Sequence, residues 1–312
     1  MHILNLPDDY SLGRILFDPR GEGEVPRVVE AQGTVRVPEG VGLHLEASQE
    51  VCDDLKRIST APPELFTQGL ILRERNLAGS NFHELRSLKL SCLIINSCNF
   101  IGVQQLRDLG ELKSLQHLNL SQTPLEAPDF SWIPRLSDLR TLLLPGMGVE
   151  DSSVPFLTSL ALLEDLDLAH SRVSDLAVQR VWGMAALKRL NLAACPIGDE
   201  AVRGVGQCPA LVSLGLSETR ISDYGIEAIA TEFLRNHRQL RSLQVRSCDI
   251  TDGALVRLAS LNGLRILDLF GTKVTFEGVA FLKRVLPACR IAVGRAQGGG
   301  PEMWQVAERN ED

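Results

Sequence analysis

Residues 187–223 read LKRLNLAACPIGDEAVRGVGQCPALVSLGLSETRISD and state one short pattern twice. The pattern is Leu-x-x-Leu-x-Leu-x-x-(Cys/Thr)-x-Ile-x-Asp; it begins at Leu187 and again at Leu211, 24 residues later. A fixed period of this size is typical of a solenoid, because each unit is too small to bury its own apolar face and must stack on its neighbours. The repeat therefore predicts an elongated array of stacked coils.

The Leu-x-Leu part of the pattern recurs along most of the chain. Its first apolar residue falls at Leu70, Leu93, Leu118, Leu142, Leu166, Leu190, Leu214, Leu243, Leu267 and Ile291. Over residues 65–293 the chain resembles a leucine-rich repeat protein of the short LxxLxLxxTxIxD class, similar to units of bacterial repeat proteins and of the repeat arms of F-box proteins. The resemblance implies a right-handed α/β solenoid, or horseshoe, with a parallel concave sheet and outer helices.

Positions within each repeat have different expected roles. Leu-x-Leu is a strand with both leucines inward and the residue between them in solvent. The next small side chains suit a buried turn in which backbone groups need partners: Cys98, Thr123, Ser171, Cys195, Thr219, Cys248 and Thr272. Further on comes an acidic row: Asp151, Asp175, Asp199, Asp223 and Asp252. We expect each aspartate to cap an outer helix; a cation bound by the row is the less favoured alternative, and we assign no metal ligand.

Composition narrows the function classes. A formal charge of −7 and a pI near 5.5 argue against a general nucleic-acid binder. The first residues lack a basic segment followed by a long apolar one, and no apolar run approaches the roughly 20 residues that span a bilayer. Seven cysteines without a Cys-x-x-Cys pair indicate buried, reduced thiols. We therefore expect a cytoplasmic protein that associates with neither membrane nor nucleic acid.

Three regions are predicted. Residues 1–60 lack the repeat and contain short apolar stretches at 13–17, 34–37 and 42–45, then a helix after Ser48; we interpret them as a β-rich N-terminal cap, with a small β module that has its own binding role as the alternative. Residues 61–293 form the solenoid, in which a 29-residue step predicts a longer outer helix within residues 224–240. Residues 294–312, which include Trp304, form a flexible tail that folds back as a cap or serves as a peptide for another protein.

The concave face supplies the candidate binding residues. Glu164, Asp165 and Asp167 lie one coil from Lys188, Arg189 and Asn191, so lateral pairing is the simplest interpretation. Nearer the C-terminus, arginines surround an aromatic residue, a composition typical of interface hot spots. The predicted partner-binding residues are Arg241, Arg246, Arg265, Asp268, Phe270, Leu143, Asp165, Asp167 and Arg189.

The favoured function is a monomeric, non-catalytic scaffold that binds another protein on the concave face and needs no cofactor. The alternative from the resemblance is a substrate-recognition subunit of a ubiquitin-ligase-like assembly, although residues 1–60 do not look like the helices of an F-box. An enzyme would need titratable groups to converge, either near His44, Asp53 and Asp54 or in the set Asp167, His170 and Ser171. We do not expect the second set to converge, because Ser171 points inward and Asp167 outward.

Overall fold

The computed structural model describes residues 2–18, 27–39, 41–59, 61–99, 101–125, 129–236 and 240–294. It divides into two compact units, residues 1–147 and residues 148–312, and each is considered by itself. Residues 295–312, for which we predicted a tail containing Trp304, lie outside the described residues. The division into a cap, a solenoid and a tail stays a prediction.

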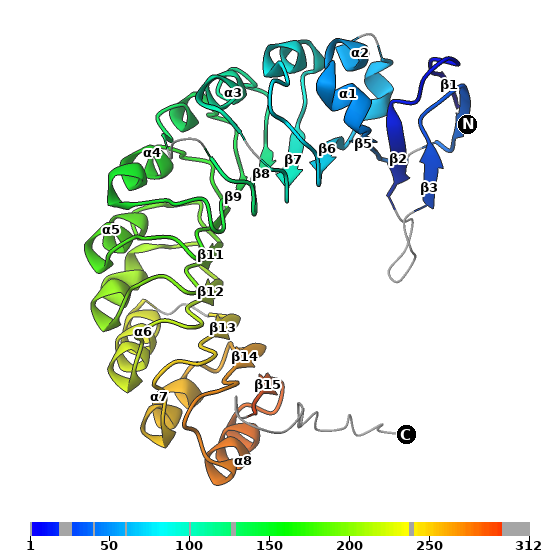
Figure 1. The fold of residues 1–312 in the computed structure, drawn as a ribbon. Coiled ribbons are helices and arrows are strands. Elements are labelled where there is room, and N and C mark those ends of the chain that lie inside the picture. Colours follow the sequence, from blue (N-terminus) through cyan, green and yellow to red (C-terminus); the bar gives the residue numbers. More distant parts are fainter. Residues whose placement is uncertain are drawn as a thin grey trace, which may run out of the picture. The chain divides into compact units, whose positions relative to one another are not determined.

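The first unit begins with strands and turns. Its N-terminal strands are β1 (His2–Asn5), β2 (Gly13–Phe17), β3 (Arg27–Glu30), β4 (Thr34–Val37) and β5 (Leu43–Ala47). β1 pairs with β4, and β2 lies between β3 and β5, in each case antiparallel. β5 also pairs in parallel with β6 (Gly69–Arg73) and so starts the series of coils (Figure 1).

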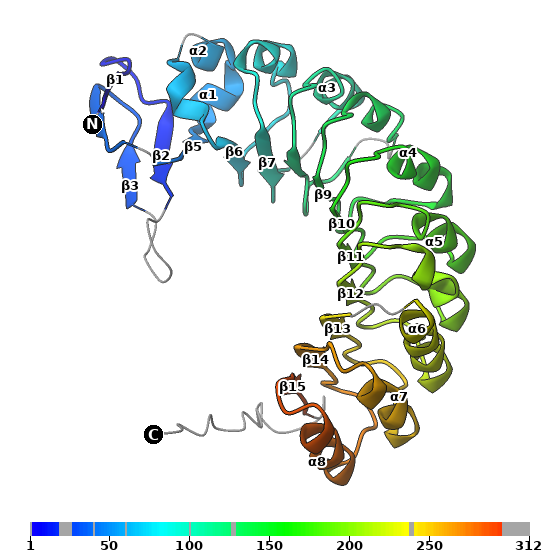
Figure 2. The ribbon, with the colours of Figure 1, turned by 180° about the vertical axis from the view of Figure 1, so that it is seen from behind.

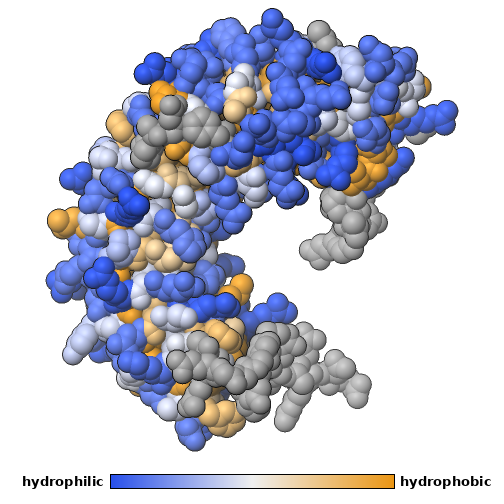
Figure 3. Space-filling view, in the orientation of Figure 1, coloured by the Kyte–Doolittle hydropathy of each residue, from blue (hydrophilic) through white to orange (hydrophobic). Residues whose placement is uncertain are grey.

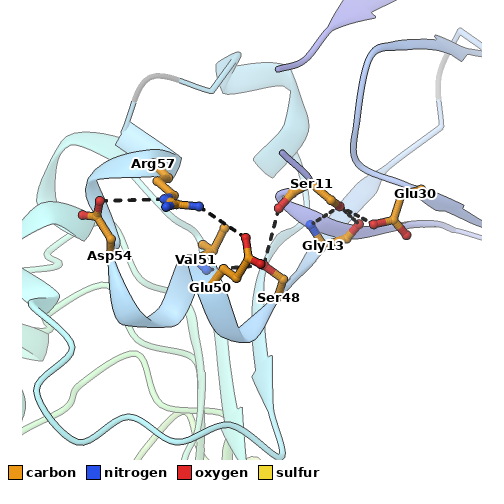
Figure 4. Close-up of polar contacts among 8 residues, drawn as sticks. All are labelled: Ser11, Gly13, Glu30, Ser48, Glu50, Val51, Asp54 and Arg57. Carbon is orange, nitrogen blue, oxygen red and sulfur yellow. Dashed lines mark hydrogen bonds and ion pairs between the residues drawn. The ribbon is translucent and has the colours of Figure 1, made fainter. Parts of the chain in front are cut away.

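The helical segment after Ser48 is split in two, α1 (Gln49–Asp53) and α2 (Lys56–Ser59). Ser48 caps α1: its Oγ accepts the Val51 N–H at 3.3 Å and donates to the Ser11 carbonyl at 3.4 Å (Figure 4). Arg57 reaches back to Glu50 and Asp54 across the break. These contacts tie the short helices to the loop before β2.

Later coils of the first unit place parallel strands side by side. They are β6, β7 (Cys92–Asn96), β8 (His117–Asn119) and β9 (Thr141–Leu143). The short helix η1 (Pro63–Phe66) precedes β6, and η2 (Phe82–Leu88), α3 (Val103–Leu109) and η3 (Ile133–Arg135) each join one strand to the next. The register sets Leu70, Leu93, Leu118 and Leu142 next to one another, as the repeat alignment predicts. All four side chains are buried.

The second unit repeats this arrangement more regularly. Its parallel strands are β10 (Asp165–Asp167), β11 (Arg189–Asn191), β12 (Ser213–Gly215), β13 (Ser242–Gln244), β14 (Ile266–Asp268) and β15 (Arg290–Ala292). Its helices are η4 (Asp151–Ser153), α4 (Val154–Thr158), α5 (Asp175–Val181), η5 (Asp199–Val202), η6 (Val205–Gln207), α6 (Asp223–Arg235), η7 (Asp252–Ala254), α7 (Leu255–Ser260) and α8 (Phe276–Val285). In each unit the helices lie on one side of the coil strands, and no described helix lies on the other face of these strands (Figures 1 and 2). The predicted α/β solenoid is confirmed.

The core is built from the repeat positions. Leu166, Leu190, Leu214, Leu243 and Leu267 are buried and stack in register, because each strand turns its leucines away from solvent. The longer helix predicted in the 29-residue step is α6, which buries Ile226, Ile229 and Phe233. The repeat therefore determines both the strand register and the apolar side of the outer helices.

The small ladder side chains serve buried carbonyls, as predicted. Cys195 Sγ donates to the Leu168 carbonyl at 3.2 Å, and Thr219 Oγ1 donates to the Leu216 carbonyl at 2.6 Å. Burial raises the pKa of Cys195 to about 11, so its thiol stays protonated and able to donate. Ser171 is an exception at the same position, because its buried Oγ has no hydrogen-bond partner among the residues that the structure describes.

The expectation that the repeat aspartates cap their own helices is wrong. The N-caps of α5, α6 and η7 are the preceding residues Ser174, Ser222 and Thr251, whose hydroxyls accept backbone N–H groups. The aspartates instead accept hydrogen bonds from the next coil: Asp151 from Ser174, Asp175 from Gly198, Asp199 from Ser222, Asp223 from Thr251 and Asp252 from Thr275. Before Asp175, Asp223 and Asp252 a hydroxyl residue already fills the cap, and every carboxylate of the row is directed to the next coil. The acidic row therefore joins coil to coil.

Candidate partner-binding surface

The face of the second unit's sheet that no described helix covers, here called the sheet face, carries two aligned columns of side chains. The register forms the first column from Asp165, Arg189, Ser213, Ser242, Ile266 and Arg290, and the second from Asp167, Asn191, Gly215, Gln244, Asp268 and Ala292. Adjacent strands in a sheet lie about 4.8 Å apart, so neighbours in a column are close enough to interact. The predicted outward positions are thus laterally aligned.

At the β10 end of the sheet face, opposite charges pair across neighbouring strands. Arg189 Nε lies 2.9 Å from Asp165 Oδ2, and just outside the strands Lys188 Nζ lies 2.7 Å from Glu164 Oε2. Asn191 Nδ2 donates to Asp167 Oδ2 at 3.1 Å. The lateral pairing expected from the sequence is confirmed, so these carboxylates and cations satisfy one another.

At the opposite end, Arg246 organises a second cluster. Its Nη2 lies 3.2 Å from Asp268 Oδ2, and its guanidinium carbon lies 4.9 Å from the centroid of the Phe270 ring. Asp268 also accepts the Phe270 N–H through Oδ1 at 3.0 Å, so it holds both partners of the stack. The structure therefore brings together three of the predicted site residues, Arg246, Asp268 and Phe270, with the arginine side chain half exposed.

Other predicted residues lie apart from this cluster. Arg241 and Arg265 are exposed at the edge where β13 and β14 begin, and neither pairs with Asp268. Leu143 belongs to β9 of the first unit, where it is partly exposed opposite Asn119. Of the nine predicted residues, the structure thus brings together Arg246, Asp268 and Phe270 and pairs Asp165 with Arg189. A binding site that includes all nine stays a prediction.

Two residues that the prediction left out belong to this surface. Ile266 is 48% exposed in the first column, and exposed Arg290 follows it in the same column. Arg290 precedes Ile291 as Arg189 precedes Leu190, so the repeat alignment could have found it. The space-filling view, which has the orientation of Figure 1 and does not look onto the sheet face, shows a described surface that is mostly hydrophilic, with apolar residues scattered among the polar ones (Figure 3).

The groups considered for catalysis pair with separate neighbours. His44 Nε2 lies 3.6 Å from Asp18, while burial lowers the pKa of the imidazole despite that carboxylate. Asp53 accepts from Gln49 at 2.9 Å, and Asp54 lies 3.8 Å from Arg57.

In the second set that we considered, Ser171 is buried, whereas His170 is exposed and Asp167 bonds to Asn191. Within the residues that the structure describes, no group of three or more His, Cys, Asp or Glu side chains is placed to hold a metal ion. Within each set, the side chains considered for catalysis thus contact different residues and are not shown to converge on one point.

Comparison with known families agrees with this geometry. A family model described as Leucine Rich repeat matches residues 236–259, which include β13 and its flanking turns. That match covers one coil, and the strand register extends the same coil through each unit. The chain has the fold of a leucine-rich repeat protein.

Solved structures of leucine-rich repeat proteins share the fold. A protein from Leptospira interrogans aligns with a TM-score of 0.53 and 19% identity over 76% of this chain and 62% of its own. An internalin from Listeria monocytogenes aligns with a TM-score of 0.53 and 17% identity over 78% of each chain. Mouse RP105, solved in complex with MD-1, aligns with a TM-score of 0.54 and 20% identity over 71% of this chain and 37% of its own. This chain thus spans less than two thirds of the Leptospira and mouse chains.

No curated protein matches the sequence of this chain. Among its described helices, none combines the length and the apolar character that a bilayer crossing requires.

Proposed function

We propose that this protein is a non-catalytic scaffold that binds another protein through the sheet face of its second unit. The observation that carries the proposal is Arg246, which pairs with Asp268 and lies over the Phe270 ring, on the sheet that also exposes Ile266. Arginine and aromatic side chains are enriched at the energetic centres of protein interfaces. A half-exposed arginine that is already oriented loses less conformational freedom when a partner binds.

The sheet supporting this cluster is well suited to binding without rearrangement. The leucines beneath it are buried, and backbone hydrogen bonds link one coil to the next, such as Ser247 N–H to the Phe270 carbonyl at 2.8 Å. Arg246 and Phe270 lie in the turns two residues after β13 and β14, so the packed strands fix the points at which these turns begin. The free-energy cost of ordering this surface when a partner binds is therefore small.

The structure of mouse RP105 with MD-1 contains two proteins in complex, so this fold is compatible with a bound protein partner. The paired charges at the β10 end support a non-catalytic role, since Arg189 and Asp165 already satisfy each other. The ubiquitin-ligase alternative gains no support from the described N-terminal residues, which form strands β1–β5 and two short helices. We also propose that the protein acts as a monomer and uses no cofactor.

A cytoplasmic location is also part of the proposal. All seven cysteines are free thiols, and burial raises the pKa of the Cys52 thiol to about 12. Buried, reduced thiols are usual in reducing compartments. Fractionation of source cells, with detection by antibody, tests this location; recovery in the culture medium would contradict it.

Site-specific photo-crosslinking tests the binding surface. Photoreactive benzoyl-phenylalanine replaces Ile266 on the sheet face in one variant and Val256 on the outer helix α7 in another; the native side chains are 48% and 68% exposed. In lysate from the source cells, we expect a specific protein adduct at position 266 and none at position 256. Adducts only at position 256, or none at either position, would contradict the proposal.

A further inference from the structure

Three arginines line the edge of the second unit's sheet where its last strands begin. Arg241 precedes β13, Arg265 precedes β14 and Arg290 starts β15, and all three are exposed. Their backbones are linked directly: the Arg265 N–H donates to the Arg241 carbonyl and the Arg290 N–H donates to the Arg265 carbonyl, each at 2.8 Å. Ser242, Ile266 and Arg290 share one register position, and Arg241 and Arg265 lie one residue before it. The three arginines, called the arginine row, thus lie on neighbouring strands at this edge of the sheet.

Three other arginines of this unit have acidic partners on neighbouring coils. Arg189 pairs with Asp165, Arg246 with Asp268, and Arg257 with Glu227 at 2.7 Å. Within the described residues, by contrast, no member of the arginine row makes an ion pair, and Arg265 Nη1 donates to the backbone carbonyl of Leu264 at 3.2 Å. The row is thus a local group of uncompensated positive charges.

The surroundings preserve this charge. The positions just before the first leucine of the last four strands are Val212, Ser213, Arg241, Ser242, Arg265, Ile266, Cys289 and Arg290, none of them acidic. The whole chain carries a formal charge of −7, so the arginine row does not reflect a general excess of basic residues. Like charges on adjacent strands also destabilise a sheet, so the row has a cost in stability. Such a concentration of positive charge attracts anionic groups.

The arginine row also borders an apolar point. Ile266 lies between Ser242 and Arg290 in its column and is 48% exposed. Burial raises the pKa of the Cys289 thiol, and the positive charge of Arg265 opposes that rise. The Arg265 guanidinium is therefore close to the last coil, which contains Cys289. A ligand on this edge would thus meet three guanidinium groups and one aliphatic side chain within neighbouring strands.

We propose that the arginine row binds an acidic segment of the protein partner, with Asp or Glu carboxylates on Arg241, Arg265 and Arg290 and an apolar side chain of the same segment on Ile266. This inference rests on the proposed function and names the chemistry of the partner. Guanidinium groups bind carboxylates through two parallel hydrogen bonds, and arginine is less strongly hydrated than lysine, which favours its use in interfaces. An exposed apolar contact adds affinity that charge alone does not supply.

Fluorescence anisotropy with the full chain tests the inference. The probe is a short fluorescein-labelled peptide of alternating Glu and Asp around a central Leu, and the reference is the same peptide with Lys in place of every acid. We expect binding of the acidic probe only, weakened by added salt because the surface charges are screened. The triple variant Arg241→Glu, Arg265→Glu, Arg290→Glu should lose about tenfold or more in affinity, and the corresponding Gln variant should also weaken binding.

A matched control reverses three exposed arginines outside the sheet strands, Arg180→Glu on α5, Arg203→Glu directly after η5 and Arg284→Glu on α8, and so has the same net charge as the triple Glu variant. We expect it to bind the acidic probe as the parent chain does. Equal losses in the two triple variants would overturn the inference, because the effect would then follow net charge. Circular dichroism and thermal unfolding confirm that each variant is folded.

Two further outcomes assign the row to another occupant and would also overturn the inference. One is tighter binding of a single-stranded oligonucleotide with the same arginine dependence. The other is a large gain in affinity on removal of residues 295–312, which would identify that segment of the chain as the ligand. Crosslinking at position 266 without any binding of the acidic probe would refute the partner chemistry and leave the proposed function standing, whereas loss of the crosslink refutes the function itself.

Discussion

Asp199 accepts two hydrogen bonds from Ser222 of the next coil, from the backbone N–H at 2.8 Å and from the hydroxyl at 2.6 Å. Ser222 Oγ in turn accepts the Tyr224 N–H at 3.2 Å and caps α6. One carboxylate thus fixes the residue that begins the next outer helix. Asp151, Asp223 and Asp252 make equivalent pairs of bonds with Ser174, Thr251 and Thr275.

Replacement Asp199→Ala should lower the free energy of unfolding by about 1–3 kcal/mol, because it removes two hydrogen bonds and leaves a partly buried N–H unpaired. Urea denaturation followed by circular dichroism measures the change. Glu200→Ala, which truncates the exposed neighbouring acid on the same coil, is the control and should change stability by less than about 0.5 kcal/mol. Equal effects of the two substitutions would show that the inter-coil bonds contribute nothing specific.

Gly225 makes room for the same carboxylate. A Cβ at this position would lie 2.4 Å from Asp199 Oδ1 and 2.9 Å from Ile221 Cγ2. Gly225→Ala should therefore destabilise the protein despite the higher helix propensity of alanine. In an Asp199→Ala background part of the clash is absent, so the same substitution should cost less. A double-mutant cycle from urea denaturation measures this coupling, and strictly additive effects would contradict the contact.

Leu190→Ala should destabilise the second unit by about 2–5 kcal/mol, because its side chain is only 2% exposed and truncation leaves a cavity between stacked coils. Leu190→Asp should unfold several coils, since it buries a charge. Leu176→Ala is the matched control, because that leucine is 74% exposed on α5. Differential scanning calorimetry compares the variants, and an unchanged midpoint for Leu190→Asp would refute the stacked core.

Cys195 should make stability fall at alkaline pH. Burial raises its pKa from 9.0 to about 11 in the folded protein, so between these values the unfolded chain holds fewer protons than the folded one. The free energy of unfolding must then decrease as pH rises through this window, by at most about 1.4 kcal/mol per pH unit for one thiol. Below pH 9 this contribution is fully present.

Cys195→Thr, which introduces the residue found at the equivalent Thr219, should reduce that alkaline slope. Urea denaturation at several pH values from 8 to 11 provides the comparison. An identical slope in the two proteins would show that the thiol does not titrate on unfolding as its burial requires.

Arg246→Ala should leave stability nearly unchanged, with a loss of about 1 kcal/mol or less, because the Arg246 side chain that makes the ion pair with Asp268 and the stack on Phe270 is itself half exposed. The same substitution should weaken the crosslink at position 266 in source-cell lysate. Thermal unfolding and adduct yield are measured together. A large drop in the melting temperature would assign Arg246 a structural role in place of a binding one.

The sequence of this protein determined the coil register, the buried leucines and the residues that face solvent. Leu190 and Leu214 are neighbours because the 24-residue period and the two-residue alternation of a strand are local properties that stacking preserves. The same alternation correctly paired Asp165 with Arg189, since both occupy one position in adjacent repeats.

Only the tertiary structure decided which long-range partner each polar side chain takes. The repeat pattern places Asp199 at a helix start, yet the distance between coils lets it reach Ser222, and Ser222 rather than Asp199 fills the cap of α6. Likewise the pattern exposes Arg246 and Arg290, but Arg246 lies over Phe270 while Arg290 joins the arginine row. Periodicity sets the direction in which a side chain leaves the backbone, whereas its contacts depend on the spacing and rotation of neighbouring coils.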